Sequence, residues 1–214
     1  DTQRSALPHL ASLMVEERSE ALAIDAATRR NLELDTSLSG RPDATLIAQA
    51  DSAVTAMGSR LLRRWLNRPL RDHATLRARY HAIGELLHSR RYLEVREPLA
   101  TIGDIERILA RVALRSARPR DLTQLRRALG VLPALRASLA ALDSPLIAAR
   151  AACISEHADA QMLLSSAIAA EPSQMLREGD VIAAGYDAAL DELRAISSDT
   201  DSFLLELERR ERER

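Results

Sequence analysis

The length, composition and charge of this chain indicate a helical protein and exclude several classes. Its 214 residues are 46% hydrophobic and 2% aromatic, with 7 glycines, 8 prolines, 1 cysteine and a formal net charge of −1. This composition is typical of an all-α protein. A single cysteine excludes an internal disulfide, and no run approaches the roughly 18 apolar residues that a membrane span needs.

The charge is unevenly distributed, and all 30 basic residues are arginine. Residues 1–59 hold 5 arginines and 9 acidic residues, residues 60–136 hold 18 and 7, and residues 137–214 hold 7 and 15, which gives formal charges of −4, +11 and −8. The arginine-rich block 60–136 is able to attract phosphate backbones. It is equally able to dock on the acidic ends of the chain or on a neighbouring domain.

Near the N-terminus, the pattern predicts one small β element. In residues 12–25, Leu13 and Val15 alternate with polar residues, and so do Leu22 and Ile24. A period of two favours a two-stranded ribbon. An isolated hairpin is marginally stable in water, so the ribbon needs a helical layer to lie on.

Two short helices are expected next. Asp25 suits the N-cap of a helix over residues 26–31. A loop at 37–43 then leads into a short helix that carries Leu46 and Ile47.

Residues 54–72 predict a longer helix that Thr55 caps and Pro69 terminates. Three apolar residues at four-residue steps form one face: Met57, Leu61 and Trp65. We expect Trp65, the only tryptophan, to anchor the core on this face.

Two further helices follow. Asp72 caps the first, whose apolar positions are Leu76, Tyr80, Ile83 and Leu87. The second is weaker, runs through Tyr92 and Leu99, and is interrupted near Pro98 because proline lacks a backbone donor.

Residues 103–122 predict two helices with a corner between them. The first helix has an apolar face of Ile105, Ile108, Leu109 and Val112, and a basic stripe of Arg107, Arg111 and Arg115. The negative charge of Asp104 interacts favourably with the positive end of the dipole of this first helix. Residues 116–119 interrupt the pattern, because Pro119 cannot continue a helix but can occupy the first position of a new one. The new helix begins with Asp121 in its first turn and an apolar seam from Leu122 onward.

The C-terminal part predicts long helices. The helix from Leu122 runs toward Leu142 with a bend at Pro133. Ser144 and Pro145 restart a helix, and a further helix covers residues 157–169. Residues 171–185 leave room only for a short turn or ribbon. From residue 187 a helical pattern continues to the last residue, with an apolar side that includes Leu190, Leu193, Phe203, Leu204 and Leu207. At 1.5 Å per residue this arm would be about 42 Å long.

The motifs that usually carry chemistry are absent from the sequence. Without lysine there is no phosphate-binding GxxxxGK[ST] loop, and no glycine pair gives GxGxxG. The five histidines never stand at a metal-site spacing with Cys153 or a carboxylate. We therefore predict a helical scaffold with no catalytic, cofactor-binding or metal-binding residues.

Four phrases of the sequence resemble the MutS family of DNA mismatch repair proteins. They are IDAATRRNLEL (24–34), VTAMGSRLLRRWLNRPLRD (54–72), GDIERILARVALRSARPRDL (103–122) and VIAAGYDAALDELR (181–194), the last followed by LELERRERER (205–214). They come in the order and at the spacings of that family, and they cover nearly the whole chain. One departure is Ala56, which stands where the family usually has proline before Met-Gly.

The resemblance implies a fragment from the middle of such a protein. Residues 1–25 would be the end of a connector and the β ribbon, 26–118 a helical core, and 119–214 lever helices that lead toward a clamp domain outside the chain. In the family these stiff helices couple an ATPase to a DNA clamp. The fragment itself would be no enzyme and hold no cofactor.

The resemblance also implies the setting of the parent protein. The parent would use ATP and magnesium, bind mismatched duplex DNA, form a dimer and act with other mismatch repair proteins. It would be cytoplasmic in a bacterium and associated with the nucleoid when on DNA, and it would not bind membranes. The fragment alone would bind DNA weakly or not at all.

Two alternatives stay open at this point. One is a stand-alone helical adaptor that binds an acidic protein partner through the block 60–136, and the other is a protein that binds the nucleic-acid backbone through the same block. The candidate contact residues are Arg107, Arg111, Arg115 and Arg118. We expect them to meet acidic groups within the protein or on adjoining domains, or else phosphates.

Overall fold

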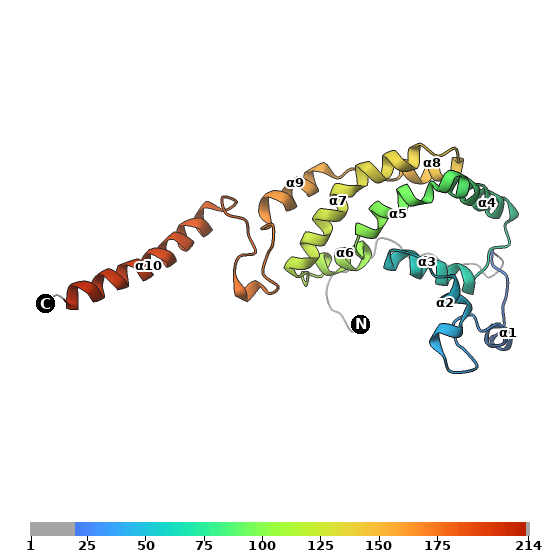
Figure 1. The fold of residues 1–214 in the computed structure, drawn as a ribbon, viewed down its shortest axis with the longest axis horizontal. Helices are drawn as coiled ribbons and strands as arrows, with labels where there is room; N and C mark the ends of the chain where they lie inside the picture. The colour runs from blue at the N-terminus through green and yellow to red at the C-terminus, as the bar shows by residue number, and fades with distance from the viewer. Residues whose placement is uncertain (1–19, 213–214) are drawn as a thin grey trace. The chain divides into compact units, whose positions relative to one another are not determined.

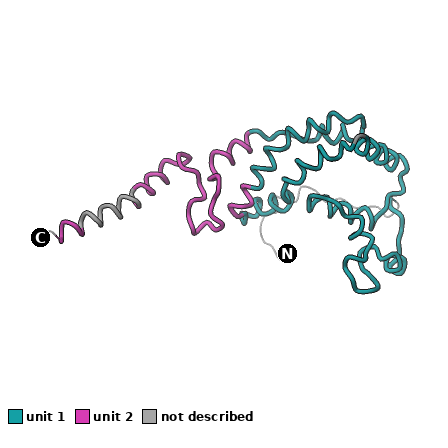
Figure 2. Tube along the Cα trace, viewed as in Figure 1, with its two compact units in different colours: residues 1–117, 124–158 teal, residues 118–123, 159–214 magenta. Residues whose placement is uncertain are grey.

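The computed structural model describes residues 20–212, which fold into helices joined by connections of varied length, the longest between α9 and α10 (Figure 1). The predicted all-α class is confirmed. The chain divides into two compact units (Figure 2), residues 1–117 with 124–158 and residues 118–123 with 159–214. Within the described part, no helix has the length and apolarity needed to cross a membrane.

The helices lie in the order that the periodicity predicts. Unit 1 contains α1 (Ala26–Asn31), α2 (Leu46–Ala50), α3 (Ala56–Asn67), α4 (His73–Leu87), α5 (Tyr92–Thr101), α6 (Ile105–Ala113), most of α7 (Pro119–Ala140) and α8 (Pro145–Ala152), with short 3₁₀ turns η2 (Pro42–Ala44) and η3 (His88–Arg90). The remaining elements are α9 (Ala158–Ala167), η4 (Leu176–Glu178) and α10 (Ala188–Arg212).

Helices in unit 1 begin where the sequence places a capping residue. The side chain of Asp25 accepts a hydrogen bond from the N–H of Thr28 at 2.7 Å, and Ser144 accepts one from Ile147 at 3.4 Å. Asp72 accepts from two N–H groups of the first turn of α4. These N–H groups have no partner inside the helix, so each cap fixes the residue at which its helix starts.

The core of unit 1 lies between α4, α5, α7 and α8. Its buried residues are Ala82, Val95, Ile102, Ala128, Leu135, Leu142 and Ile147. Ala128 is completely buried, and Ala82 is the one buried residue of α4. Two of these seven residues are alanines and five are larger aliphatic residues, so the helices pack through side chains of both sizes.

Two predicted apolar faces are partly exposed, and the prediction that Trp65 anchors the core was wrong. Trp65 is 40% exposed and does not anchor the core. On α4, Tyr80 is 68%, Ile83 49% and Leu87 62% exposed, whereas the covered side is that of Ala82. The physical reason is that a period of 3.6 identifies a stripe on a helix but does not identify which stripe a neighbour covers.

The predicted N-terminal ribbon is not formed in the described residues. Its first strand lies outside them. Its second half is not a strand, because residues 20–22 pair instead with the segment that follows α3. Ala21 forms a single antiparallel bridge with Leu70, and the N–H of Leu22 donates to the carbonyl of Pro69 at 2.8 Å. This segment offers unpaired backbone groups there because Pro69 cannot continue the helix.

The predicted corner after α6 is present and is a Schellman motif. The N–H of Ser116 donates to the carbonyl of Arg111 at 2.8 Å, and the N–H of Arg115 donates to that of Val112 at 3.0 Å. Arg115 has a φ of +54°, the left-handed conformation that this motif requires and that glycine adopts most easily. The next helix begins at Pro119, as the sequence predicts.

In unit 2, a short backbone pairing holds the start of α10. Ile168 and Ile182 form an antiparallel bridge, which agrees with the turn or ribbon predicted for 171–185. Arg194 donates to the carbonyl of Ile182 at 3.0 Å and to Asp191 at 3.1 Å, and Asp191 accepts from the N–H of Gly185 at 2.7 Å.

The predicted C-terminal helix is confirmed as α10. Leu193, from its predicted apolar side, is 63% exposed. The other residues named for that side near the tip, Phe203, Leu204 and Leu207, lie outside the residues whose side chains the structure describes.

The corner yields a prediction about stability. Replacing Arg115 with glycine should raise the free energy of unfolding by about 0.5–1 kcal/mol, because the left-handed conformation then costs no side-chain clash. Urea denaturation followed by circular dichroism measures this change. As a control, Ala110→Gly inside α6 should lower the free energy of unfolding by about 1 kcal/mol. A loss of stability in Arg115→Gly would contradict the prediction.

Candidate functional site

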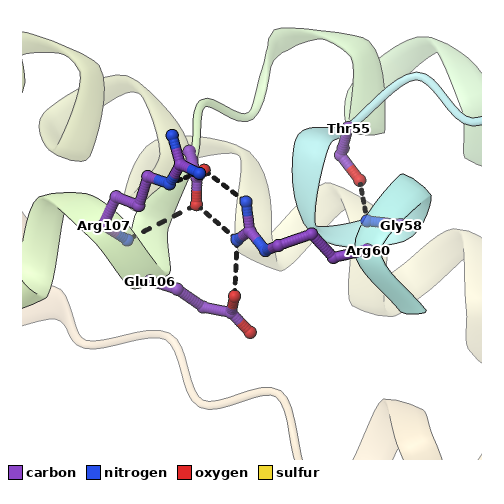
Figure 3. Close-up of polar contacts among 6 residues, drawn as sticks. Thr55, Gly58, Arg60, Glu106 and Arg107 are labelled. Atoms are coloured by element: carbon purple, nitrogen blue, oxygen red, sulfur yellow. Dashed lines mark hydrogen bonds and ion pairs between the residues drawn. The ribbon is translucent and has the colours of Figure 1, made fainter. Parts of the chain in front are cut away.

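A carboxylate at the start of α6 joins that helix to α3 (Figure 3). The guanidinium of Arg60 donates to both oxygens of Asp104, at 2.7 and 2.8 Å, and also to Glu106 at 2.5 Å. The Asp104 side chain is 18% exposed, that of Arg60 38% and that of Glu106 68%. A two-pronged contact between guanidinium and carboxylate fixes distance and orientation together. We call Arg60, Asp104, Glu106 and Arg107 the α3–α6 joint.

A capping hydrogen bond closes the N-terminus of α3, just before Arg60. The hydroxyl of Thr55 accepts a hydrogen bond from the N–H of Gly58 at 3.0 Å (Figure 3). A Cβ atom added at Gly58 would lie 3.0 Å from that hydroxyl oxygen and 3.2 Å from the Cβ of Ala53. Glycine at position 58 therefore leaves room for the hydroxyl of Thr55 to cap α3 ahead of Arg60. The loss of the usual family proline at Ala56 leaves this cap intact.

Asp104 has a second role as the N-cap of α6. It accepts a hydrogen bond from the N–H of Arg107 at 3.4 Å, and the Nε of Arg107 lies 3.4 Å from its Oδ2. The hydrogen bonds from Arg60 lower the pKa of Asp104 more than partial burial raises it, and the contacts with Arg107 lower it further. The same contacts raise the pKa of Arg60. Asp104 and Arg60 are therefore both ionised at neutral pH.

The four candidate arginines named from the sequence have different surroundings. Arg107 belongs to the α3–α6 joint. The carbonyl of Arg111 and the backbone of Arg115 form the corner after α6. Arg118 precedes α7, and its N–H donates to the side chain of Asp121 at 3.0 Å. The structure thus brings only Arg107 to the joint.

Sequence reasoning missed Arg60 and Glu106 as members of the joint. The sequence placed Arg60 only within the arginine-rich block 60–136. Its partner Asp104 lies 44 residues further along the chain, and no local spacing rule connects residues that far apart. The cap position of Asp104 was the one sequence feature that pointed toward the joint.

A second group of side chains surrounds the exposed Trp65. The guanidinium carbon of Arg79 lies 3.8 Å from the centre of the Trp65 ring, a cation–π contact between α4 and α3. Beside it is a pocket of about 280 Å³, whose lining includes Leu61, Arg64 and Leu70. The contact explains how a partly exposed indole is held without a core around it.

These groups of side chains give little indication of catalytic activity. Among the described residues, no three histidine, cysteine, aspartate or glutamate side chains are grouped so that they would hold a metal ion. Cys153, at the end of α8, is exposed. The α3–α6 joint contains charges that satisfy one another, and such an arrangement positions helices.

Comparison with protein families gives a match that covers most of the chain. The family model described as MutS domain III matches residues 27–213. This range contains every residue of the α3–α6 joint and runs from α1 into the end of α10.

The joint predicts a stability loss that depends on pH. Asp104→Asn keeps a capping side chain but removes the ion pair, so it should lower the free energy of unfolding at pH 7 by about 1 kcal/mol. Because folding lowers the pKa of Asp104, its ionised form stabilises the folded state above the ordinary value of 3.8. The difference between wild type and variant should therefore be constant at neutral pH and shrink as the pH falls below that value.

Urea denaturation at pH 7 and at a pH at least about one unit below the ordinary pKa of aspartate measures both parts of this prediction. The matched control is Glu106→Gln, which removes the exposed carboxylate of the same joint and should cost less than about 0.5 kcal/mol. Equal losses in the two variants would show that the bidentate contact has no special weight.

Proposed function

The chain belongs to the MutS domain III family, and from this premise we propose that it is the core and lever part of a MutS-like DNA mismatch repair protein. Its role is mechanical: it transmits changes between an ATPase domain and a DNA clamp that lie outside these residues. The parent protein binds mismatched duplex DNA and, with magnesium, ATP. It acts as a dimer with other repair proteins in the bacterial cytoplasm and on the nucleoid.

The observation that carries this proposal is the α3–α6 joint. A helix transmits a displacement only if its ends are fixed to their neighbours, because a loosely packed helix end shifts on its own. Arg60 and Asp104 fix the start of α6 to α3 through a bidentate contact, which resists sliding better than apolar packing does. At its other end, α6 continues into the hydrogen-bonded Schellman turn. The helix is thereby fixed at both ends.

Contacts of the arginine block support a scaffold role over binding of nucleic acid. Arg60 and Arg107 bind carboxylates within the chain. Arg91 donates to the carbonyl of Ala141 at 2.9 Å, and Arg96 donates to that of Ser52 at 2.6 Å. Arginines used in this way are not available as a stripe of phosphate contacts. The charge of +11 is therefore a poor guide to DNA affinity.

Grafting tests the proposed function. Residues 27–213 replace domain III of an intact bacterial MutS protein, with and without Asp104→Asn. We expect the wild-type graft to keep ATP hydrolysis, mismatched-duplex binding and the ATP-induced change in duplex affinity. The Asp104→Asn graft should keep the first two and lose at least about 5-fold of the third, which is the scale of a coupling free energy between sites.

The Glu106→Gln graft is the matched control and should behave like the wild-type graft. ATPase assays and duplex titrations with and without ATP measure the three quantities. A wild-type graft that folds and binds duplex but shows no response to ATP would contradict the proposal. It would favour the stand-alone adaptor instead.

The isolated chain should bind duplex DNA weakly. We expect no saturable binding at physiological salt, and only a shallow dependence of any residual binding on salt concentration, because few phosphates are contacted. Fluorescence anisotropy with matched and mismatched duplexes measures both. Tight binding with a steep salt dependence would favour a direct role of the arginine block 60–136 on DNA.

A further inference from the structure

Two side chains tie the base of α10 to the segment that precedes it. Both carboxylate oxygens of Asp191 accept hydrogen bonds, one from the backbone N–H of Gly185 at 2.7 Å and the other from Arg194 at 3.1 Å. The second terminal nitrogen of Arg194 donates to the carbonyl of Ile182 at 3.0 Å. We call these two side chains, with the two backbone groups that they bind, the α10 clasp. It lies within residues 181–194, a phrase of the sequence that the α3–α6 joint does not use.

The backbone that the clasp binds is itself held in place. Ile182 pairs with Ile168, just after α9, and the N–H groups of Ala169 and Ala183 donate to the opposite segment at 2.9 Å each. Ile168 and Val181 are only 6% and 7% exposed, so apolar burial stabilises the same pairing. The clasp therefore joins α10 to a fixed pair of backbone segments.

An ion pair within one helix does not by itself direct that helix. The pair of Arg212 with Glu208, near the other end of α10, is of this kind, and such exposed pairs stabilise a helix only slightly. The clasp differs because its contacts reach backbone groups 6 and 12 residues away from the side chains that make them. Two such contacts, from adjacent turns of the helix, restrain its tilt and its rotation together, whereas a single contact would leave a pivot.

The length of α10 makes its direction sensitive to its base. The helix has 25 residues, which extend about 37 Å at about 1.5 Å per residue. A tilt of about 5° at the base would therefore displace the far end by about 3 Å. A lever whose base tilts freely delivers no defined displacement, so the restraint at its base matters more than the strength of any one contact.

We propose that Asp191 and Arg194 are positioning residues that set the direction of α10, so that α10 and the pairing of Ile168 with Ile182 move as one body. The inference rests on the proposed mechanical function and deepens it, because it names the contact through which a displacement at the end of α9 reaches α10. The guanidinium of Arg194 is suited to this role. Its planar fork donates to a carboxylate and a carbonyl at once, which the point charge of lysine does not reproduce.

Distance measurements on the 214-residue chain test whether the clasp sets the direction of α10. Spin labels are attached to Ala160→Cys of α9 and Arg210→Cys of α10 in a Cys153→Ser background, and double electron–electron resonance gives the distribution of distances between them. We expect one narrow distribution for the intact clasp. Arg194→Gln, which removes the guanidinium, should widen this distribution about twofold or more.

Two further variants separate direction from folding. Arg212→Gln is the matched control, because it removes an ion pair of the same helix that makes no part of the clasp, and it should leave the width unchanged. Arg194→Lys keeps the charge without the planar fork, so its width should lie between those of the wild type and Arg194→Gln. Far-UV circular dichroism measures the helix content of each variant. If Arg194→Gln loses helix content, Arg194→Lys at retained content decides.

A functional measurement uses the graft of residues 27–213 into an intact bacterial MutS protein. Arg194→Gln should keep ATP hydrolysis and mismatched-duplex binding, and lose at least about 5-fold of the ATP-induced change in duplex affinity. Arg212→Gln should behave like the wild-type graft. A loss confined to the ATP response is a result that a merely structural role of Arg194 would not produce.

The outcomes distinguish this proposal from the proposed function. A wild-type graft without an ATP response contradicts the mechanical function, and the distance distributions then still decide whether the clasp sets the direction of α10. A responsive wild-type graft that Arg194→Gln leaves unaltered overturns the role of the clasp alone. The proposal is also overturned if Arg194→Gln leaves the distance distribution unchanged, or if Arg212→Gln widens it equally.

Discussion

The carboxylate of Asp104 joins two helices of unit 1 at one point. It caps α6, and it holds Arg60 of α3 through two hydrogen bonds. The residue before it, Gly103, packs against α7: a Cβ atom there would lie 2.9 Å from Oε1 of Gln124. The end of the flexible Gln124 side chain would have to move to admit a larger residue at position 103. The direction of α6 and its charge contact with α3 are therefore both set at Asp104.

The corner after α6 shows a different way of fixing a helix. At the joint, charged side chains from distant parts of the chain meet. At the corner, backbone hydrogen bonds close a turn within six residues, and Arg115 accepts the left-handed conformation that the turn needs. A non-glycine residue in that conformation carries strain, which the surrounding hydrogen bonds offset. Both ends of α6 are thus determined, one by charge and one by the backbone.

The features that the sequence predicted are those whose causes are local. Caps such as Asp25 and Asp72, and the break at Pro119, depend on residues within one turn of each other, so the order of the helices followed directly. The exposure of faces such as those of Trp65 and Tyr80 depends on which helix packs beside them, and on α4 the core covers the side of Ala82 instead. The pair Arg60–Asp104 joins positions 44 residues apart, and only the folded chain reveals it.

The absence of lysine has a structural consequence, whatever its origin. Arg60 grips a carboxylate with two donors, and Arg79 lies over the face of Trp65 at 3.8 Å. Both contacts use the planar shape of the guanidinium, which the point charge of lysine does not reproduce. Arginines at such positions stabilise the fold. Position among neighbours, more than the total charge of the block 60–136, decides what each arginine does.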